Sequence, residues 1–508
     1  MPSLTVIRGD MRLNIPFSGN PPLKDVLESS GIILPHPCGG RGLCGKCRLK
    51  AKGALSETPD ENGTVRACKA RLIGDAEVTV PDTAPEMAIE TGGGDTPASC
   101  TANAYPETAS AAQTCPSQPD AASAYPAAAV DLGTTTIVLR LFGTPDNPLA
   151  DAAALNPQTA VAADVMGRIG AALDGQLGRL NAFAADAIRD LLSRACAGAG
   201  LDPASVRRLC VTGNTTMLYL LTCRDPVSLS AAPFRADCLF DIDTMLSDIP
   251  AYLPPCMNAF VGADITCAVL ASGMTESAGP ALLMDLGTNG EQALWKDGVL
   301  YVTSTAAGPV FEGAGISCGC GSVPGAVDRV TVLPDKTIKA HTIGNKPPVG
   351  LCGSGLIDAV AAFLKTGALD ETGATDADAL EICDTVSLLP ADIRAVQMAK
   401  AAVAAGLKTM LHVSGTQVED ISRLYLAGGF GSHLDPASAA AIGLIPDSLV
   451  PRTRVIGNAA LTGACMLLND PAAVISAKEI AAEARHVPLG GNPVFNQAYI
   501  EEMLFGHG

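Results

Sequence analysis

Basic side chains are scarce in this chain. Its 508 residues include 34 Lys and Arg against 52 Asp and Glu, a formal net charge of −18 at neutral pH. Such a chain is repelled by polyanions, because phosphate-rich partners are bound mainly through clustered positive charge. The composition therefore argues against nucleic acid or an anionic membrane surface as a partner.

Long apolar runs and a targeting segment are also missing. No apolar stretch approaches the roughly 18 residues that a membrane-spanning helix needs. The first residues, Met-Pro-Ser-Leu-Thr-Val, contain neither the basic nor the apolar part of a secretory signal. The 17 cysteines, an odd number, then favour reduced thiols over a disulfide framework. We expect a cytoplasmic protein with no membrane segment.

What the chain does have is a group of four cysteines near its N-terminus. Cys38, Cys44 and Cys47 are spaced Cys-x5-Cys-x2-Cys in a glycine-rich stretch, and Cys68 follows later. Three thiolates on one loop and a fourth farther along are typical of 2Fe-2S ferredoxins, although the first gap of the plant type is one residue shorter. The glycines let the backbone approach the cluster and point N–H groups at its sulfurs. The spacing therefore predicts a 2Fe-2S cluster and a role in electron transfer.

A structural zinc site is the alternative for these cysteines. Zinc sites usually contain two close Cys pairs, whereas here the fourth cysteine stands alone, so the cluster is favoured. The flanking sequence predicts strands at 4–7, 12–15 and 76–80 and a helix at 23–30. This order of strands, helix and cluster loop resembles the β-grasp ferredoxin fold over residues 1–82.

The chain is too long for one hydrophobic core, so several domains are expected. Residues 83–127 are rich in Ala, Pro, Ser and Thr, and no Lys or Arg occurs between Arg71 and Arg140. This composition is typical of a flexible linker. Cys100 and Cys115 lie in it. We interpret them as incidental, with a second metal or redox pair as the alternative.

After the linker, a short motif occurs twice. Residues 129–136 read Ala-Val-Asp-Leu-Gly-Thr-Thr-Thr, and residues 283–290 read Leu-Met-Asp-Leu-Gly-Thr-Asn-Gly. A second pair of segments, 209–215 and 424–431, consists of hydrophobic strands that end in glycine-containing turns. The duplication predicts two related α/β lobes.

Each Asp-Leu-Gly-Thr motif has the chemistry of a phosphate-binding hairpin. The glycine permits a tight turn, and exposed N–H groups and Thr hydroxyls can donate hydrogen bonds to phosphate oxygens. The Asp would repel a phosphate unless a cation lay between them, which implies Mg²⁺. One copy could be an ordinary hairpin turn, but two copies in related lobes can face each other across a cleft. The residues predicted to bind the phosphates and their Mg²⁺ are Asp131, Gly133, Thr134, Thr135, Asp285, Gly287, Thr288 and Asn289.

These two hairpins resemble the phosphate motifs of the actin, sugar kinase and heat-shock ATPase superfamily. The segment 427–432 resembles its adenosine motif, in which Gly428, Gly429 and Gly431 let the backbone approach the nucleotide. The resemblance implies two RNase H-like lobes that bind Mg-ATP in the cleft between them. No Walker P-loop, Gly-x4-Gly-Lys-Ser/Thr, is present.

The expected fold is therefore multidomain, combining α/β and α+β parts. A β-grasp 2Fe-2S ferredoxin occupies residues 1–82, and the flexible linker occupies 83–127. The two actin-like ATPase lobes occupy 128–278 and 279–508. Within the lobes, helical spacing is present at 164–198 and from Asp392 to His412.

Two carboxylates are candidates for orienting the water that attacks the γ-phosphate. Asp264 lies where the superfamily places its interdomain connecting helix, and capping that helix is the alternative role for it. Glu291, which follows Asp285 closely, is the second candidate.

A 2Fe-2S ferredoxin joined to an actin-like ATPase resembles the reductive activators of corrinoid enzymes. Further segments look like that family's sequence: 304–314, 316–319, 351–358, 392–402 and 456–464. The resemblance implies ATP-dependent transfer of one electron from the cluster to the inactive cob(II)alamin of a corrinoid protein in a methyltransferase system, restoring cob(I)alamin. An upstream low-potential donor would reload the cluster, and a homodimer is left open.

The chain departs from that family in two places. Typical members have a folded domain between ferredoxin and ATPase, where this chain has a short linker of low complexity. Cys318 and Cys320 form a Cys-Gly-Cys pair where the family usually has a single Cys. A small buried residue is the favoured role for this pair, and a redox or metal role is the alternative.

Three other functions fit part of the sequence. The second-ranked function is an activator of another low-potential enzyme, such as a CoA-ester reductase or dehydratase. Those activators bridge a 4Fe-4S cluster across a dimer, whereas this chain has the cysteine spacing of a ferredoxin domain. A small-molecule kinase would need a catalytic base that no motif marks. An electron carrier with a vestigial nucleotide site disagrees with the intact Asp131 and Asp285.

Overall fold

The structure is a computed structural model that describes residues 2–8, 11–30, 32, 34, 47–60, 62–80, 125–383, 385–429 and 434–506. Cys38, Cys44, Gly431 and the predicted linker, apart from its last residues, lie outside the described residues. None of the helices in the described ranges combines the length and the apolar character needed to span a bilayer.

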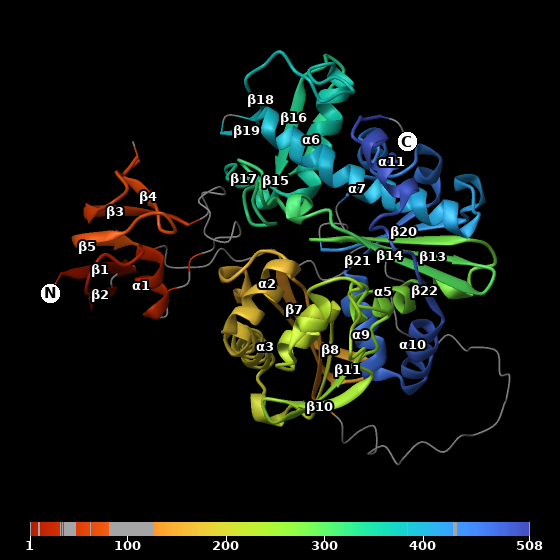
Figure 1. The fold of residues 1–508 in the computed structure, drawn as a ribbon, viewed down its shortest axis with the longest axis horizontal. Coiled ribbons are helices and arrows are strands. Elements are labelled where there is room, and N and C mark those ends of the chain that lie inside the picture. The colour runs from red at the N-terminus through yellow and green to blue at the C-terminus, as the bar shows by residue number, and fades with distance from the viewer. Residues whose placement is uncertain are drawn as a thin grey trace.

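The N-terminal part forms a five-stranded mixed sheet with one helix (Figure 1). The strand order is β2-β1-β5-β3-β4, with β1 antiparallel to β2 and parallel to β5. Its core contains Leu4, Leu23, Leu27 and Leu72. The predicted hairpin, helix and last strand are confirmed. The elements are β1 (Ser3–Arg8), β2 (Met11–Pro16), α1 (Leu23–Ser29), β3 (Arg48–Leu55), β4 (Thr64–Arg66) and β5 (Leu72–Thr79).

The first Asp-Leu-Gly-Thr motif lies in a six-stranded sheet of order β10-β11-β9-β6-β7-β8. Its strands are β6 (Ala127–Leu132), β7 (Thr136–Thr144), β8 (Asn147–Leu155), β9 (Arg208–Gly213), β10 (Ile242–Leu246) and β11 (Ile249–Leu253). Three helices accompany these strands: α2 (Val165–Ala171), α3 (Leu177–Ala199) and α4 (Thr215–Leu221). The predicted helical stretch 164–198 is thus confirmed, but it bends at Asp174 and Gly175, where the backbone leaves the helical conformation.

The second motif lies in another six-stranded sheet, of order β21-β20-β12-β13-β14-β22. Its strands are β12 (Ala281–Leu286), β13 (Gly290–Lys296), β14 (Val299–Thr305), β20 (Arg423–Ala427), β21 (Thr453–Gly457) and β22 (Ala484–His486). In each sheet the motif strand forms a hairpin with the next strand and pairs in parallel with a later one, β9 or β20. The predicted duplication is therefore visible in the topology.

Further helices and short strands lie on the side of the second sheet that faces away from the first sheet (Figure 1). The long helix α7 (Pro390–Ser414) contains the stretch predicted from Asp392 to His412. The others are β15 (Ala326–Val332), β16 (Ile338–Thr342), β17 (Gly350–Leu351), α6 (Gly353–Thr366), β18 (Leu380–Cys383), β19 (Val386–Leu388), α8 (Pro436–Ala441) and α11 (Pro493–Glu501).

Three helices lie between the two six-stranded sheets: α5 (Ala263–Ser272), α9 (Ala459–Asn469) and α10 (Pro471–Glu483) (Figure 1). The α5 side chain Ile265 packs in a core with Leu283 of the second sheet, whereas Leu461 of α9 packs with Phe142 of the first. Each sheet is thus covered by a helix from the other half of the sequence. The helices touch closely, since a Cβ at Gly463 would lie 2.1 Å from the Cys267 carbonyl oxygen.

Candidate functional site

The two predicted phosphate hairpins lie at equivalent places in the two sheets. Asp131 pairs with Val138 across the first hairpin, and Asp285 pairs with Glu291 across the second. The first turn needs glycine, because a Cβ at Gly133 would lie 2.5 Å from the Thr136 carbonyl oxygen. Sequence repetition has therefore produced two turns of the same kind, each with an Asp just before it.

The hairpins meet through side chains. Thr135 Oγ1 lies 3.0 Å from Thr288 Oγ1, although the two residues lie in turns that connect strands of different sheets. Glu312 Oε2 accepts a hydrogen bond from each hydroxyl, of 2.6 Å from Thr135 and 2.8 Å from Thr288. Glu312 ends a 3-10 helix, Pro309–Glu312, that follows β14. The two hairpins thus meet at this contact.

Glu312 was not predicted as a site residue. It lies inside the segment 304–314 that carries the family resemblance, but no spacing rule connects it to either hairpin. Both hydroxyl protons are used in the contacts with Glu312 Oε2, so the Thr135–Thr288 contact has no proton of its own. Burial raises the pKa of Glu312, while the Thr135 and Thr288 hydroxyls and the charge of Arg168 lower it.

Asp264 lies in the first turn of α5, and the helix is capped by Gly262 instead. The alternative role of Asp264 as the N-cap is therefore wrong. Its Oδ1 accepts the Ile265 N–H over 2.9 Å, so the carboxylate is held at the start of its own helix. Glycine is required at 262, because a Cβ there would lie 2.4 Å from the Asn214 Cα. The close approach brings the start of α5 against the turn that follows β9.

Five buried carboxyl groups lie in this region, and for three of them neighbouring carboxylates add to the effect of burial on the pKa. Burial raises the pKa of Asp131 to about 6. Burial and the charge of Asp131 raise the pKa of Asp264 to about 7. Burial, Asp264 and Asp131 raise the pKa of Asp285 to about 8. Burial, followed by Asp264 and Asp285, raises the pKa of Glu291 well above its ordinary value. The fifth carboxyl group is that of Glu312.

A cation would relieve this accumulation of like charge, which agrees with the Mg²⁺ predicted from the sequence. However, within the described ranges no three His, Cys, Asp or Glu side chains converge closely enough to hold a metal ion. Mg²⁺ commonly keeps several waters and takes few ligands from the protein, with phosphates supplying others. The residues therefore fit a cation that arrives with a phosphate ligand better than a cation held by protein alone.

Three polar side chains that support the first hairpin escaped the sequence interpretation. Arg168, fully buried in α2, donates to the Thr134 carbonyl oxygen over 2.6 Å. Asn214 Nδ2 donates to Thr134 Oγ1 over 2.9 Å. Asn458, just before α9, donates to Asp131 Oδ2 over 2.9 Å. The capping preference of Asn before a helix was a signal for the last two, but it does not indicate which distant side chain they contact.

The predicted adenosine motif begins beside the second hairpin. Gly428 has φ of +111°, and a Cβ there would lie 2.4 Å from the Leu286 carbonyl oxygen and 3.0 Å from Asp285 Oδ1. A larger residue would push the motif away from the hairpin. Around Gly429, by contrast, an added Cβ would meet no atom within 4 Å. Gly431 lies outside the described residues.

Two of the four predicted cluster cysteines lie in the described residues, and they are adjacent. Cys47 Sγ lies 3.2 Å from Cys68 Sγ, with Cys47 buried and Cys68 partly buried. The neighbouring backbone is tied together, since the Ala67 N–H donates to the Cys47 carbonyl oxygen over 3.0 Å. Two thiols at this separation are suited to binding one metal centre.

Comparison with known proteins decides the family. A sequence model described as the RACo middle region matches residues 126–277, and one described as the C-terminal domain of RACo, the ASKHA domain, matches residues 279–508. The corrinoid activation enzyme RamQ of Eubacterium limosum is 31% identical over 417 residues, which are 74% of this chain and 70% of RamQ. The chain belongs to the RACo family. The family predicted from the combined motifs is thereby confirmed.

Two further relatives support this RACo-family assignment. The [Co(II) methylated amine-specific corrinoid protein] reductase of Methanosarcina barkeri is 27% identical over 346 residues, which cover 60% of this chain and 64% of the reductase. A solved structure titled reductive activator for corrinoid,iron-sulfur protein superposes with a TM-score of 0.72 at 25% identity, covering 100% of this chain and 99% of that one. The predicted mixed α/β multidomain fold with a C-terminal actin-like ATPase domain is confirmed.

This RACo-family chain also has a shorter and more distant similarity. Over 87 residues it is 28% identical to one subunit of the Na(+)-translocating NADH-quinone reductase of Neisseria meningitidis, and the match covers 15% of this chain and 21% of that subunit. So short a match leaves the ferredoxin assignment and its cluster a prediction.

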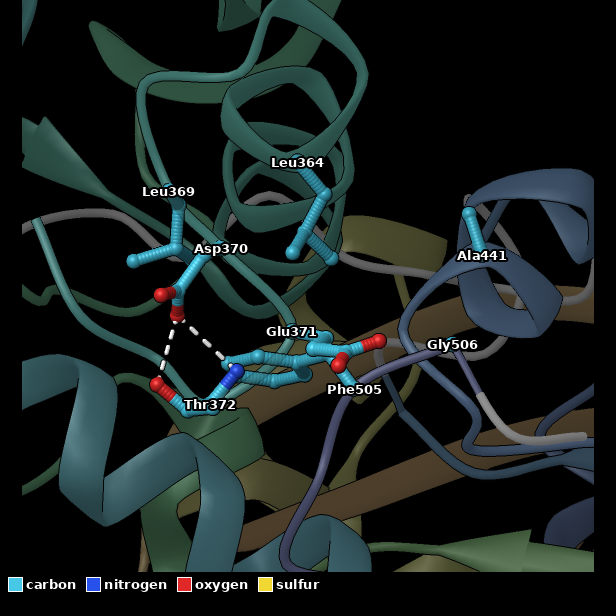
Figure 2. Close-up of a pocket in the computed structure, with 8 residues that line it drawn as sticks. All are labelled: Leu364, Leu369, Asp370, Glu371, Thr372, Ala441, Phe505 and Gly506. Atoms are coloured by element: carbon cyan, nitrogen blue, oxygen red, sulfur yellow. Dashed lines mark hydrogen bonds between the residues drawn. The ribbon is translucent and has the colours of Figure 1, made fainter.

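A separate cavity of about 510 Å³ lies near the end of α6 and contains none of the predicted site residues (Figure 2). Asp370 lies in its lining, and one of the Asp370 carboxylate oxygens accepts from the Thr372 hydroxyl and N–H. The remaining lining residues are Leu364, Leu369, Glu371, Ala441, Phe505 and Gly506. The cavity is thus no part of the candidate nucleotide site.

The Cys-Gly-Cys pair lies in a tightly held loop. The Cys320 N–H donates to the Leu351 carbonyl oxygen, and the Leu351 N–H donates to the Cys318 carbonyl oxygen, both over 2.9 Å. Gly319 between them is required, because a Cβ there would lie 2.0 Å from the Gly313 carbonyl oxygen. These contacts give the segment a structural role. Both cysteines are only partly buried, so the expected role as a small buried residue is wrong in that respect. A redox or metal role stays a prediction.

Proposed function

We propose that this RACo-family protein is an ATP-dependent reductive activator. It transfers one electron from an N-terminal 2Fe-2S cluster to the inactive cob(II)alamin of a corrinoid protein and so restores cob(I)alamin. The observation that carries the proposal is the contact between Thr135 and Thr288, because it brings the phosphate-binding turns of two related sheets to one place. Reduction and activation of corrinoid proteins in the named relatives support the same conclusion.

Nucleotide binding is assigned to the two hairpins. Thr135, Thr288 and the turn N–H groups donate to the phosphates of ATP, while Asp131 and Asp285 hold Mg²⁺ directly or through water. The cation supplies charge neutralisation of the phosphates. The phosphates are also bound by the turn residues Gly133, Thr134, Gly287 and Asn289. The adenosine is bound beside Gly428, Gly429 and Gly431.

Asp264 and Glu291 are the proposed catalytic carboxylates. Both lie close enough to the hairpin carboxylates to be affected by them: the charge of Asp131 raises the pKa of Asp264, and the charges of Asp264 and Asp285 raise the pKa of Glu291. A carboxylate placed there can accept a hydrogen bond from the water that attacks the γ-phosphate. Asp264 Oδ1 accepts the Ile265 N–H over 2.9 Å, and Glu291 Oε1 accepts from Ser304 Oγ over 3.1 Å. Asp264 is the stronger candidate, because it lies where the superfamily places its interdomain connecting helix.

Electron transfer is assigned to residues 1–82. Cys38, Cys44, Cys47 and Cys68 bind the 2Fe-2S cluster, and residues 83–127 link this ferredoxin domain to the ATPase lobes, 128–278 and 279–508. The reduction potential of cob(II)alamin lies below that of an ordinary ferredoxin, so the electron transfer is uphill. A gap of about 100 mV costs roughly 2.3 kcal/mol for one electron. Binding of ATP to one arrangement of the lobes can supply such an amount through a population shift.

The proposed partners follow from this chemistry. One is a corrinoid protein of a methyltransferase system, and the other is a low-potential donor that reloads the cluster. Reduced thiols and a 2Fe-2S cluster favour the cytoplasm as the location of the protein.

Two variants test whether electron transfer and nucleotide binding are both needed. Cys44→Ser should still hydrolyse ATP but reduce no corrinoid, and Asp285→Ala should keep a reducible cluster and also fail. The readouts are phosphate release, the visible spectrum of the cluster and the anaerobic absorbance of a corrinoid protein from the same genome. Failure of the wild-type protein to reduce any such corrinoid protein would favour an activator of a CoA-ester reductase or dehydratase.

A further inference from the structure

Glu312 holds the two hydroxyls on which the proposed phosphate site depends. A hydroxyl carries one proton, so Thr135 cannot donate to a carboxylate and to a phosphate at once, and the same is true of Thr288. Both donate to the same oxygen, Glu312 Oε2, over 2.6 and 2.8 Å. The other oxygen, Oε1, lies 3.9 Å from the position a Cβ would take at Gly287, in the turn of the second hairpin.

We propose that Glu312 is a built-in competitor for the phosphate site: its carboxyl group binds the two hydroxyls that ATP needs, and the terminal phosphate of ATP displaces it. This inference rests on the proposed nucleotide site and adds the residue that couples phosphate arrival to a movement of the protein. A carboxylate and a phosphate are both oxygen acceptors of negative charge, so one can replace the other at the same donors. They also repel each other, so they cannot share the site.

The displaced residue is connected to a long helix. Glu312 is followed by Gly313, whose φ is +78° and whose added Cβ would lie 2.5 Å from the Cys320 carbonyl oxygen. Farther along this loop, Ser317 donates to Asp392 through both its N–H and its hydroxyl, over 2.8 and 2.5 Å. Asp392 lies in the first turn of α7. The loop from Glu312 to Ser317 is therefore fixed to the hairpins at one end and to α7 at the other.

Helix α7 in turn rests directly on the second sheet. Gln292 Nε2 of β13 donates to the Val403 carbonyl oxygen over 2.7 Å, and a Cβ at Gly290 would lie 2.8 Å from Val403 Cγ2. Such close packing transmits a shift of the loop rather than absorbing it. Displacement of Glu312 by a phosphate would therefore move the loop and shift α7.

Nucleotide affinity tests the competition. In the cluster-loaded full chain, Glu312→Ala should bind a non-hydrolysable ATP analogue about tenfold more tightly, since ATP no longer has to break charged hydrogen bonds. The affinity for AMP, which lacks the terminal phosphates, should be unchanged. Glu312→Gln, which keeps an acceptor but no charge, should fall between wild type and Glu312→Ala. Isothermal titration calorimetry with Mg²⁺ measures each affinity. Glu276→Ala is the matched control, because Glu276 also ends a 3-10 helix, Met274–Glu276, but is exposed.

Hydrogen exchange without nucleotide gives an independent readout. Loss of the bridge in Glu312→Ala should speed exchange of residues 133–136 and 287–290, and Glu276→Ala should not. An unchanged affinity for the ATP analogue in Glu312→Ala, with normal binding by wild type, would overturn the competition. A weaker affinity would overturn it as well and would assign Glu312 to holding the nucleotide. If neither protein binds any nucleotide, the proposed function itself is wrong.

Discussion

Asn458 Nδ2 donates a hydrogen bond to Asp131 Oδ2 over 2.9 Å, although 327 residues separate them. The other end of the same amide, Oδ1, accepts the Leu461 N–H over 2.8 Å and caps α9. One side chain thus ties the start of a helix from the C-terminal half to the first phosphate hairpin. A neutral amide suits this position, because it can donate to the carboxylate while accepting from the helix.

Replacing Asn458 by Asp tests this link. Asp is as good a helix cap as Asn, so α9 should form normally, but two carboxylates would then face each other. We expect a loss of roughly 1–3 kcal/mol in unfolding free energy at pH 8. The loss should be smaller at pH 5, where one carboxyl group is protonated and can donate to the other.

Asn492→Asp is the control for this substitution. Asn492 caps α11 by accepting from Val494 and Phe495, and within the described residues its side chain makes no hydrogen bond to a carboxylate. Equal destabilisation by both substitutions, or a loss at Asn458 that does not depend on pH, would contradict the account of the Asn458 contact.

Nucleotide binding should depend on the two hairpin carboxylates. Asp131→Ala or Asp285→Ala should abolish ATP turnover by removing the side chains that face the cation, and should leave the visible spectrum of the cluster unchanged. Asp378→Ala, at an exposed position, should turn over ATP as the wild type does. Phosphate release and the visible spectrum measure the two properties. Normal turnover in both hairpin variants would move the nucleotide site elsewhere.

Much of the fold could be predicted because it depends on local patterns. The hairpins at Asp131 and Asp285 follow from a glycine turn after a buried strand, and α7 follows from its helical spacing. The bend at Asp174 and Gly175 was missed, since a single glycine in a helical pattern does not fix its own conformation. The sequence also did not predict that α5 covers the second sheet and α9 the first. Both helices are apolar on several sides, so their sequences do not specify which sheet they cover.

The site could be predicted only where residues of one segment act together. Asp131, Thr135, Asp285 and Thr288 are indicated by the repetition of their motif. Glu312 is not, because its role depends on a contact with residues far away in the chain, and short sequence patterns carry no information on such contacts. Arg168 was missed for a similar reason, since a lone Arg in a helix is usually a solvated residue.

The acidic site should make the metal-free protein less stable as the pH rises. Asp131, Asp264 and Asp285 have folded-state pKa values of about 6, 7 and 8, above the ordinary value of 3.8. Between the ordinary and the folded values the folded state binds more protons than the unfolded state, so their contribution to stability is lost as the pH rises toward 8.

Chelator-treated protein measures this effect. Fluorescence of Trp295, the single Trp, follows unfolding of the second sheet, to which its strand β13 belongs. Asp285→Asn should weaken the decline in the unfolding midpoint between pH 5 and pH 8, and Asp378→Asn should not. Excess Mg²⁺ should weaken it in wild type, because the cation favours the ionised carboxylates. An identical pH profile in wild type and Asp285→Asn would show that Asp285 ionises without cost.

The cysteine spacing predicts about two irons and two acid-labile sulfides per chain. Cys47→Ser should lower both, since Cys47 lies beside Cys68 and a serine oxygen is a poorer ligand for this cluster. Cys223→Ser, at an exposed position, should change neither. Iron and sulfide analysis of anaerobically purified protein provides the measurement. Stoichiometric zinc without sulfide would replace the cluster by a structural zinc site.

The central claim, that ATP drives an electron onto the corrinoid, is tested most directly by an anaerobic absorbance assay. The cluster-loaded protein is mixed with chemical reductant and a cob(II)alamin-containing corrinoid protein from the same genome, with or without Mg-ATP. The account predicts that the cob(II)alamin absorbance is replaced by that of cob(I)alamin when Mg-ATP is present and remains when it is left out. Equal rates with and without ATP would contradict it.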